Sequence, residues 1–452
     1  MKKSSLKLTT SQFILLGFIV VIIAGSILLA LPVSSATGKA VPYIDALFTA
    51  TTATCVTGLV TLPTVTAWST FGQVIILLLI QIGGLGIVAV LSGLMLMLNR
   101  KIGVAERLLI QDAFNLNTLS GLVRFVKKVF KGTAVIELVG AVLYMPVFIP
   151  QFGIRGIWIS VFNSVSAFCN AGIDIISQNS LCNYALNPLV NFVTAALIIL
   201  GGLGYVVWWD VIRVMELRRH KKIKFWKSLS LHSKIAISAT AAFIFIGTVG
   251  VLVFEFNNPQ TFGNYNFWQK LMASFFQSVT TRTAGFATVP QENLTSGSAI
   301  LSVFLMFIGG SPVGTAGGIK TVTIVVIIAT MVTVVKNKNH VNLFGRKLTE
   351  TAIRKAVAVA SVSFFTALLS TLLLSLVTNA AAIDIIYESV SATATVGLTR
   401  NLTASLNQWG KIIIIATMYF GRVGPISLAF ALSGKGKNEN IIENPTEEIS
   451  VG

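Results

Sequence analysis

Charged and reactive side chains are scarce in this sequence. Asp, Glu, Lys and Arg together make up 11% of the 452 residues, whereas about 25% is usual in a soluble domain. The three cysteines, Cys55, Cys169 and Cys182, show no CxxC spacing and no paired spacing with histidine, so neither a disulfide framework nor a zinc site is supported. The three histidines all lie in basic segments, and no acid, base and nucleophile set occurs within an apolar stretch. These absences exclude a soluble enzyme and a disulfide-stapled secreted domain, and they argue against an intramembrane enzyme.

Long apolar runs dominate what is present. Hydrophobic residues make up 54% of the chain, and uncharged runs at 13–31, 189–209, 235–254 and 356–377 each approach or exceed the roughly 20 helical residues needed to cross a bilayer. The first run follows a basic start that resembles a signal peptide, but it is long and many further runs follow it. We therefore expect a retained first helix in a polytopic helical membrane protein.

Positive charge is concentrated beside the apolar runs. The formal net charge is +18, and 26 of the 34 Lys and Arg residues lie in five segments, at 2–7, 100–131, 213–234, 336–355 and 435–437. Lys and Arg accumulate in cytoplasmic loops. We expect a cell-membrane protein with these segments and both termini in the cytoplasm. This placement argues against a nucleic-acid partner, although acidic headgroups or an acidic protein remain secondary partners.

Four short polar and apolar segments repeat along the chain. Each begins with an aromatic residue, ends with a glycine ten positions later, and is filled mostly by small or hydroxyl-bearing residues; they span 48–58, 162–172, 275–285 and 387–397. The four final glycines are separated by 114, 113 and 112 residues, close to one quarter of the chain. The sequence therefore consists of four copies of one unit.

Each copy is expected to contain a long helix, a short segment and a second long helix. A segment of about ten residues cannot cross ~30 Å of hydrocarbon at 1.5 Å per residue, so we expect a re-entrant half-helix. Non-helical backbone at this depth needs surrounding protein or water. The predicted fold is an all-α polytopic membrane protein with eight full spans, in four tandem membrane helix–pore loop–membrane helix repeats with pseudo-fourfold symmetry around a central ion pore.

The expected boundaries follow from the repeats and the basic segments. The four repeats occupy 1–99, 132–215, 235–335 and 356–432. The segments between them are basic cytoplasmic linkers at 100–131 (amphipathic), 216–234 and 336–355, and a polar cytoplasmic tail follows at 433–452.

The repeated glycines suggest an ion filter. Glycine permits positive φ, so successive carbonyls can point at one axis and replace the water shell of a monovalent cation, and the half-helix C-termini add partial negative charge. Only two charged residues fall in these segments, Glu388 near the start of the fourth and Arg282 near the end of the third. The expected K⁺ filter residues are Val56, Thr57, Gly58, Asn170, Ala171, Gly172, Thr283, Ala284, Gly285, Thr395, Val396 and Gly397. Acidic residues expected near the outer mouth would concentrate cations; they are Asp45, Asp174, Glu255, Glu292, Asp384 and Glu388.

A second glycine landmark lies in the second helices, at 83–86, 201–204, 309–310 and 421–424. Close helix packing explains the first two copies adequately. The third copy has five glycines and a proline within ten residues, which breaks the helix, and this loop is expected to face the conduction path as a gate. The expected gate residues are Gly309, Gly310, Ser311, Pro312, Gly314, Thr315, Gly317, Gly318, Lys320 and Arg422.

Two of these gate candidates, Lys320 and Arg422, are cations within predicted spans. Intramembrane charges are costly and usually face a cavity or a partner. Both are gate candidates because they would repel a permeating cation, and a buried pair or a snorkelling side chain is the structural alternative. Glu137 is a possible pairing partner.

With four such repeats and one glycine in each, at Gly58, Gly172, Gly285 and Gly397, the sequence resembles the Trk/Ktr/HKT superfamily of cation transporters over nearly its whole length. It has no additional spans before the first repeat, which makes it most similar to membrane subunits of the Ktr potassium uptake type (KtrB). The resemblance implies potassium uptake through a single-chain pore, often stimulated by Na⁺, in a homodimer. It further implies a cytosolic ring of nucleotide-binding RCK subunits, KtrA-like, that gate with ATP and ADP.

The resemblance also carries residue roles. All four filter positions are glycine, with no serine in the first copy, which is the pattern associated with potassium over sodium. The loop 309–318 matches the intramembrane loop that occludes the pore, and Arg422 matches an arginine near it. The alternative is an alternating-access secondary cation transporter, which a broken helix beside Lys320 also suits. Inverted repeats would favour that alternative, whereas the parallel fourfold repeat favours a central pore.

Overall fold

The computed structural model describes residues 9–98, 103, 107–108, 110–111, 121–221 and 224–424. The tail at 433–452 and most of the linker at 100–119 lie outside these residues. Within the described part, the only strands form a small hairpin in which β1 (Asn342–Leu343) pairs antiparallel with β2 (Arg346–Lys347). The predicted all-α fold is confirmed.

Four long helices open the four repeats. They are α1 (Thr10–Ala30), α7 (Leu122–Phe152), α12 (Leu231–Glu255) and α16 (Glu350–Val377). All four are long and apolar enough to cross a membrane. Large apolar side chains such as Leu138, Val253 and Leu376 are exposed on them, which fits a lipid-facing surface. Residues 122–131, expected as linker, belong to α7.

A shorter helix follows each long helix and packs against it. These helices are α2 (Tyr43–Cys55), α8 (Arg155–Phe168), α13 (Phe267–Thr280) and α17 (Ala382–Thr393). Their middle and C-terminal residues are largely buried. At 12 to 14 residues they are too short to span the hydrocarbon, and we call them the pore helices.

The second helices are shorter than the sequence suggested. They are α4 (Thr70–Leu85), α9 (Pro188–Leu203), α14 (Ser296–Phe307) and α19 (Gln408–Val423), with 16, 16, 12 and 16 residues. Each starts at a capping side chain that accepts a backbone N–H three residues on, and the caps are Ser69, Asn187, Thr295 and Asn407. Among the described residues, four helices meet the length and apolarity of a span, or up to six if each bent pair is one span, so the expected number of eight full spans stays a prediction.

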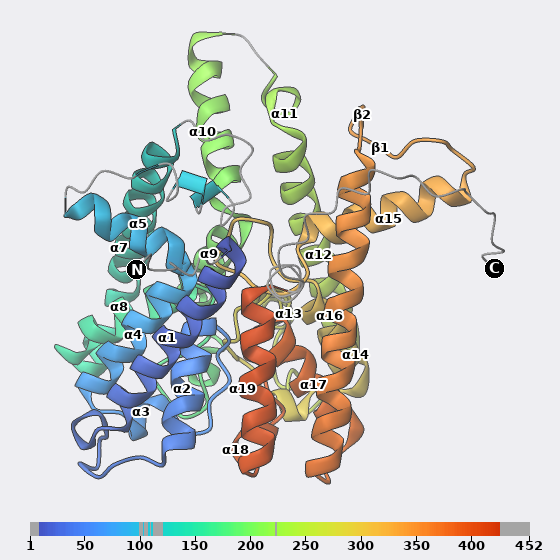
Figure 1. The fold of residues 1–452 in the computed structure, drawn as a ribbon. Helices are drawn as coiled ribbons and strands as arrows, with labels where there is room; N and C mark the ends of the chain where they lie inside the picture. Colours follow the sequence, from blue (N-terminus) through green and yellow to red (C-terminus); the bar gives the residue numbers. More distant parts are fainter. Residues whose placement is uncertain are drawn as a thin grey trace.

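Glycines turn the second helices sharply. Gly86 and Gly204 end α4 and α9 with φ of 87° and 88° and ψ of 140° and 143°, a conformation suited to glycine. The chain continues at 100° and 94° as α5 (Ile87–Met97) and α10 (Tyr205–His220). In the third repeat the helix is interrupted completely between α14 and α15 (Thr321–Val335), and α15 runs outward at the side of the molecule (Figure 1).

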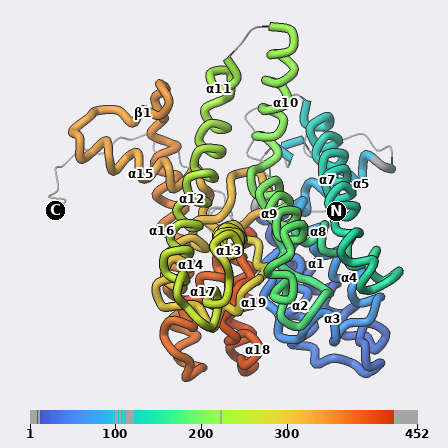
Figure 2. Tube along the Cα trace, turned by 180° about the vertical axis from the view of Figure 1, so that it is seen from behind, coloured from blue at the N-terminus to red at the C-terminus, as the bar shows by residue number. Residues whose placement is uncertain are grey.

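The four repeats close into a ring. Within every repeat, the long helix packs against its own pore helix and second helix. Between repeats, each second helix packs on the next pore helix, in the pairs α4–α8, α9–α13, α14–α17 and finally α19–α2. The first and last repeats therefore lie side by side, as Figures 1 and 2 show from opposite sides.

Short elements complete the two ends of the molecule. Figure 1 shows α10, α11 (Phe225–Ser228) and the β1–β2 hairpin at one end, and α3 (Thr64–Ala67) and α18 (Leu402–Ser405) at the other. The short 3₁₀ turns are η1 (Pro32–Ser34), η2 (Cys182–Tyr184) and η3 (Gln291–Asn293). The described parts of the basic linkers at 216–234 and 336–355 therefore lie at one common end.

Candidate functional site

The four repeated glycines meet at the centre of the ring. A Cβ atom added to Gly58 would lie 2.6 Å from the Ala171 carbonyl oxygen, and one added to Gly285 would lie 2.5 Å from that of Val396. A Cβ atom added to Gly172 would likewise collide with the Ala284 carbonyl oxygen, and one added to Gly397 would collide with that of Thr57. Each glycine thus contacts the backbone of another repeat, in the cyclic order first, second, third, fourth and back to the first. We call residues 56–58, 170–172, 283–285 and 395–397 the glycine triplets.

The backbone of each triplet has an unusual conformation at both ends. The glycines have φ between 63° and 98°, which the sequence anticipated. The first residue of each triplet also has positive φ although it is not glycine: Val56 (55°), Asn170 (58°), Thr283 (67°) and Thr395 (51°). Such residues are uncommon in this region, and β-branched ones there are outliers. Asparagine tolerates this conformation, but valine and threonine do not favour it, so no sequence signal indicated Val56, Thr283 and Thr395.

Hydroxyl groups of the pore helices hold the triplets in place. Thr52 Oγ1 accepts the N–H of Gly58 at 3.0 Å, and Ser391 Oγ accepts the N–H of Gly397 at 3.0 Å. Thr280 Oγ1 donates to the Phe286 carbonyl at 2.6 Å. We did not single these residues out from the sequence, although the richness of the repeated segments in Ser and Thr was the signal that pointed to them.

The centre of the ring contains polar oxygens that no protein group satisfies. Within the described part of the chain, the buried hydroxyls of Thr54, Thr57 and Thr395 have no hydrogen-bond partner. All three are fully buried or nearly so. A buried hydroxyl without a partner costs free energy, and the Thr395 hydroxyl lies close to Gly317 of the loop 309–318.

The loop 309–318 crosses the ring directly against the triplets. Thr315 Oγ1 donates to the Phe168 carbonyl at 3.0 Å and to the Asn170 side-chain oxygen at 3.3 Å. Gly317 lies so close to Thr395 that any side chain would collide with it. The loop is therefore packed against the second and fourth repeats and is enclosed by protein rather than exposed to lipid.

Backbone hydrogen bonds fix both ends of this loop. Ser311 N–H donates to the Gly202 carbonyl at 2.8 Å, and Thr315 N–H donates to that of Gly201 at 3.1 Å. Gly309 N–H bonds Ile319 O at 2.9 Å. The remaining gate glycines are packed tightly as well: a Cβ on Gly310 would contact Ala316, one on Gly314 would contact Gly201, and one on Gly318 would contact Gly309. The carbonyl oxygen of Pro312 occupies the place that a Cβ on Gly204 would take. All the expected loop residues thus form one unit with the end of α9.

Two cations are anchored to the loop by carbonyl groups. Lys320 Nζ donates to the Ala316 carbonyl at 2.6 Å. Arg422 donates to the Thr315 carbonyl at 2.6 Å and to that of Gly83, which ties the loop to α4. The suggested pairing with Glu137 is wrong, because that carboxylate instead accepts from Gln81 Nε2 at 3.2 Å. The sequence could not show that the Thr315 carbonyl in the loop and the Gly83 carbonyl in α4 lie closer to Arg422 than Glu137 does.

The glycine pairs of the second helices have a packing role. Gly83, Gly201 and Gly421 each face a carbonyl at the C-terminal end of their own pore helix, those of Thr54, Phe168 and Thr393 respectively, with no room for a Cβ atom. The packing explanation is therefore correct at these positions. Close packing does not account for the sharp bends at Gly86 and Gly204, which the sequence did not predict.

Most of the outer acidic residues are occupied by protein groups. Lys411 pairs with Asp45 at 2.6 Å and Arg400 with Asp384 at 2.7 Å. Glu388 accepts the hydroxyls of Thr399 and Thr403, and Glu255 accepts those of Thr261 and Thr295, besides Asn258. Asp174 lies in the loop after α8, where burial raises its pKa to about 6. Glu292 is exposed. The negative potential that six free carboxylates would produce near the outer mouth is therefore much weaker than expected.

The chain has extensive similarity to known transport proteins. A family described as cation transport protein, TrkH, matches residues 8–441. The potassium/sodium uptake protein NtpJ of Enterococcus hirae is 38% identical over 100% of this chain and 99% of its own length. The Ktr system potassium uptake protein B of Bacillus subtilis is 38% identical, over 99% and 97% of the two chains.

The fold is also found in a solved transporter structure. The crystal structure of the potassium transporter TrkH from Vibrio parahaemolyticus superposes with a TM-score of 0.74 over 95% of this chain and 86% of that one, at 16% identity. The family match covers nearly the whole chain, and the ring of repeats with its central glycines accords with it. The chain therefore belongs to the TrkH family of cation transport proteins, whose members are membrane transporters rather than enzymes.

Proposed function

We propose that this protein takes up potassium across the cell membrane through a channel-like pore at the centre of the ring. The observation that carries the proposal is the cyclic contact of the four glycine triplets, each glycine packed against the backbone of another repeat. Relatives that are 38% identical and named for potassium or potassium/sodium uptake support K⁺, and Na⁺ beside it, as the transported ions.

The ion is selected by backbone carbonyls rather than by charged side chains. Carbonyl rings replace the hydration shell of a monovalent cation, and positive φ at both ends of each triplet reorients successive peptide groups. The pore helices end directly before the triplets or with one or two residues between, so their partial negative charges point toward the ion. The unpartnered hydroxyls of Thr54, Thr57 and Thr395 supply further oxygens.

The loop 309–318 closes this pathway on the side of the basic linkers. It lies against the triplets, and Lys320 and Arg422 add positive charge there. A permeating cation is repelled until these groups move. The loop is held by a small number of hydrogen bonds to Gly201, Gly202 and Arg422, so breaking those bonds opens the path.

Regulation comes from a partner on the cytoplasmic face. Relatives bear the name Ktr system potassium uptake protein B, which supports a multi-component system. We infer a homodimer seated on a KtrA-like ring of RCK subunits that bind ATP or ADP, with both termini and the basic linkers in the cytoplasm. The basic elements gathered at one end of the molecule suit an acidic partner surface.

Cation flux into liposomes tests the proposal directly. The purified protein is reconstituted, and uptake of K⁺, Rb⁺, Na⁺ and Li⁺ is compared. Uptake of K⁺ and Rb⁺ well above Na⁺ and Li⁺ is expected. Flux that ignores ion identity would contradict the filter assignment. If flux is absent, adding the nucleotide-binding partner separates a closed pore from a wrong function.

A further inference from the structure

One buried arginine beside the triplets has no role in the transport scheme so far. Arg282 immediately precedes Thr283, the first residue of the third triplet, and it is 6% exposed. The equivalent positions, three residues before the glycine in the other repeats, are Cys55, Cys169 and Ala394, which are small, neutral and buried. The third repeat therefore places a full positive charge where the other three place none.

No carboxylate neutralises this charge. Among the described residues, none of the ion pairs within 4 Å includes Arg282. Among the residues that the structure describes, its guanidinium donates only to Thr240 of α12, to the carbonyl at 3.3 Å and to the hydroxyl at 3.3 Å, and its Nε has no partner there. Both hydrogen bonds are long for charge-assisted bonds. Arginine does not lose its proton in proteins, so the charge stays in the interior.

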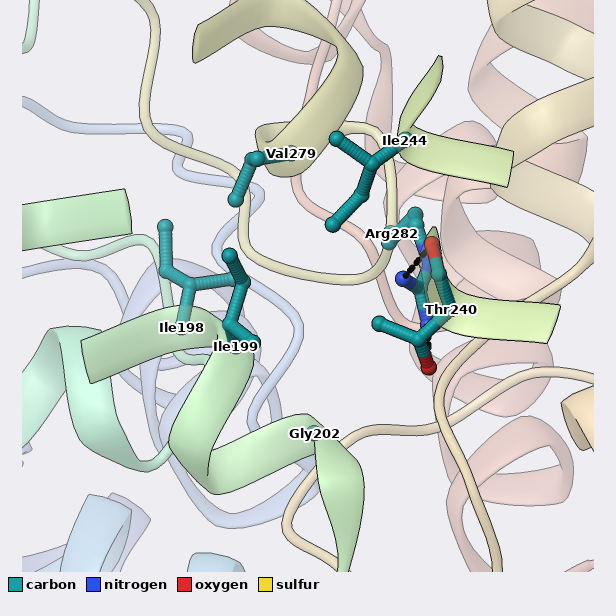
Figure 3. A pocket seen from close by; sticks show the side chains of 7 residues that line it. All are labelled: Ile198, Ile199, Gly202, Thr240, Ile244, Val279 and Arg282. Carbon is teal, nitrogen blue, oxygen red and sulfur yellow. Dashed lines mark hydrogen bonds between the residues drawn. The ribbon is translucent and has the colours of Figure 1, made fainter. Parts of the chain in front are cut away.

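The surroundings leave this charge poorly screened. The side chain borders a small cavity that is otherwise lined by Thr240 and by apolar groups of Ile198, Ile199, Gly202, Ile244 and Val279. Figure 3 shows Ile198 and Ile199 across the cavity from the guanidinium. Electrostatic interactions act over a longer range in such a low-dielectric environment than in water.

We propose that Arg282 sets the affinity of the pore for its cation, by opposing the attraction of the carbonyl ring and so speeding release. This inference rests on the proposed function of the glycine triplets. Arg282 also lies at the C-terminal end of α13, which ends at Thr280, and offsets the partial negative charge of that helix. Three pore helices attract the ion while the fourth is neutralised, which keeps binding weak enough for rapid transport.

The size of the effect follows from the distance. Gly285 is three residues from Arg282, so their Cα atoms are at most roughly 11 Å apart. The guanidinium extends from this Cα to Thr240 on α12, so we take a charge separation on the order of 12 Å; with an effective dielectric constant of about 20, Coulomb's law then gives a factor of about ten in the binding constant. Removing the charge is therefore expected to strengthen cation binding about tenfold.

The test compares charge with hydrogen bonding. K⁺ dependence of uptake is measured in liposomes for wild type, Arg282→Gln, Arg282→Met, Arg282→Lys and Thr240→Val. The two neutral variants are expected to reach half-maximal rate at about tenfold lower K⁺ and to have a lower maximal rate. Arg282→Lys keeps the charge and Thr240→Val removes only the hydroxyl partner, so both are expected to keep the wild-type K⁺ dependence.

A binding measurement without transport provides a second readout. Binding to the folded state raises thermal stability by an amount that depends on the logarithm of one plus the ratio of ligand concentration to Kd, so the K⁺ concentration that gives the same stabilisation of the detergent-solubilised protein should fall about tenfold in Arg282→Gln. An unchanged or higher K⁺ requirement in the neutral variants, a Lys variant that behaves like them, or the same change in Thr240→Val would overturn the proposal. Failure of both neutral variants to fold would make Arg282 a structural support and also reject it. If wild type itself shows no saturable K⁺ flux, the proposed function fails instead.

Discussion

Replacing Gly58 by serine tests the triplet geometry most sharply. Gly58 has φ of 98°, and an added Cβ would lie 2.6 Å from the Ala171 oxygen, 3.2 Å from the Gly397 Cα and 3.3 Å from the Gly172 Cα. Ordinary contact begins near 3.4 Å, and all three neighbours are backbone atoms. The second triplet must therefore move by most of an ångström, or the first must change conformation.

The energy involved is enough to alter selectivity. A left-handed conformation costs a residue with a Cβ atom roughly 1–2 kcal/mol, and the collision adds to this cost. If the ring relieves the strain by leaving its K⁺-binding geometry, the preference for K⁺ over Na⁺ falls by a factor of about 5–30, the ratio that corresponds to 1–2 kcal/mol.

Competitive uptake of K⁺ and Na⁺ into liposomes measures this ratio. Gly38→Ser is the matched control, because Gly38 also has positive φ (71°) but has no atom within 4 Å of its added Cβ. It carries the backbone strain without the collision and is expected to keep wild-type selectivity. A folded Gly58→Ser protein with unchanged selectivity would refute the reasoning.

Three further predictions concern the loop, an ion pair and one carboxyl group. Deleting residues 311–317, or replacing Arg422 by Gln to remove its bond to the Thr315 carbonyl, should raise K⁺ flux severalfold in liposomes; a folded variant that conducts no faster would contradict the gating role. Lys411→Met leaves the buried Asp45 carboxylate unpaired and should cost about 3 kcal/mol of stability, seen as a lower Tm, whereas Arg354→Met in the exposed pair with Glu350 should cost under about 1 kcal/mol; equal losses would refute this. Because burial raises the pKa of Asp174 from 3.8 to about 6, the folded protein holds a proton that the unfolded chain releases between these values, so stability should rise as pH falls through about 6. Asp174→Asn should lack that rise, and an identical pH profile of Tm would count against it.

The sequence was informative wherever one residue type has one dominant physical consequence. Equal spacing of Gly58, Gly172, Gly285 and Gly397 predicted a fourfold unit, and a run of five glycines and a proline predicted the break that the structure has between α14 and α15. Both follow from backbone freedom and from the lost N–H of proline.

Long side chains and helix bends were less predictable. The Arg422 side chain has several rotatable bonds, so the sequence did not determine its partner; it donates to the carbonyls of Thr315 and Gly83 rather than to a carboxylate. The glycines at the ends of α4 and α9 are compatible with a continuous helix as well as with a turn near 100°, and only tertiary packing chooses between them. The roles of the triplet and loop residues stay predictions until flux is measured.

The closed order of the four repeats has a consequence for biogenesis. Lys411 and Asp45 are 366 residues apart in sequence, and α19 packs on α2, so the contact between the fourth and the first repeat cannot form until α19 has been synthesised. A chain truncated before α19 would keep all four glycine triplets, because the fourth ends at Gly397 and α19 starts at Gln408, but it would leave exposed the flank of α2 that α19 covers. The seam between α19 and α2 is therefore the last of the four inter-repeat seams that can form during synthesis.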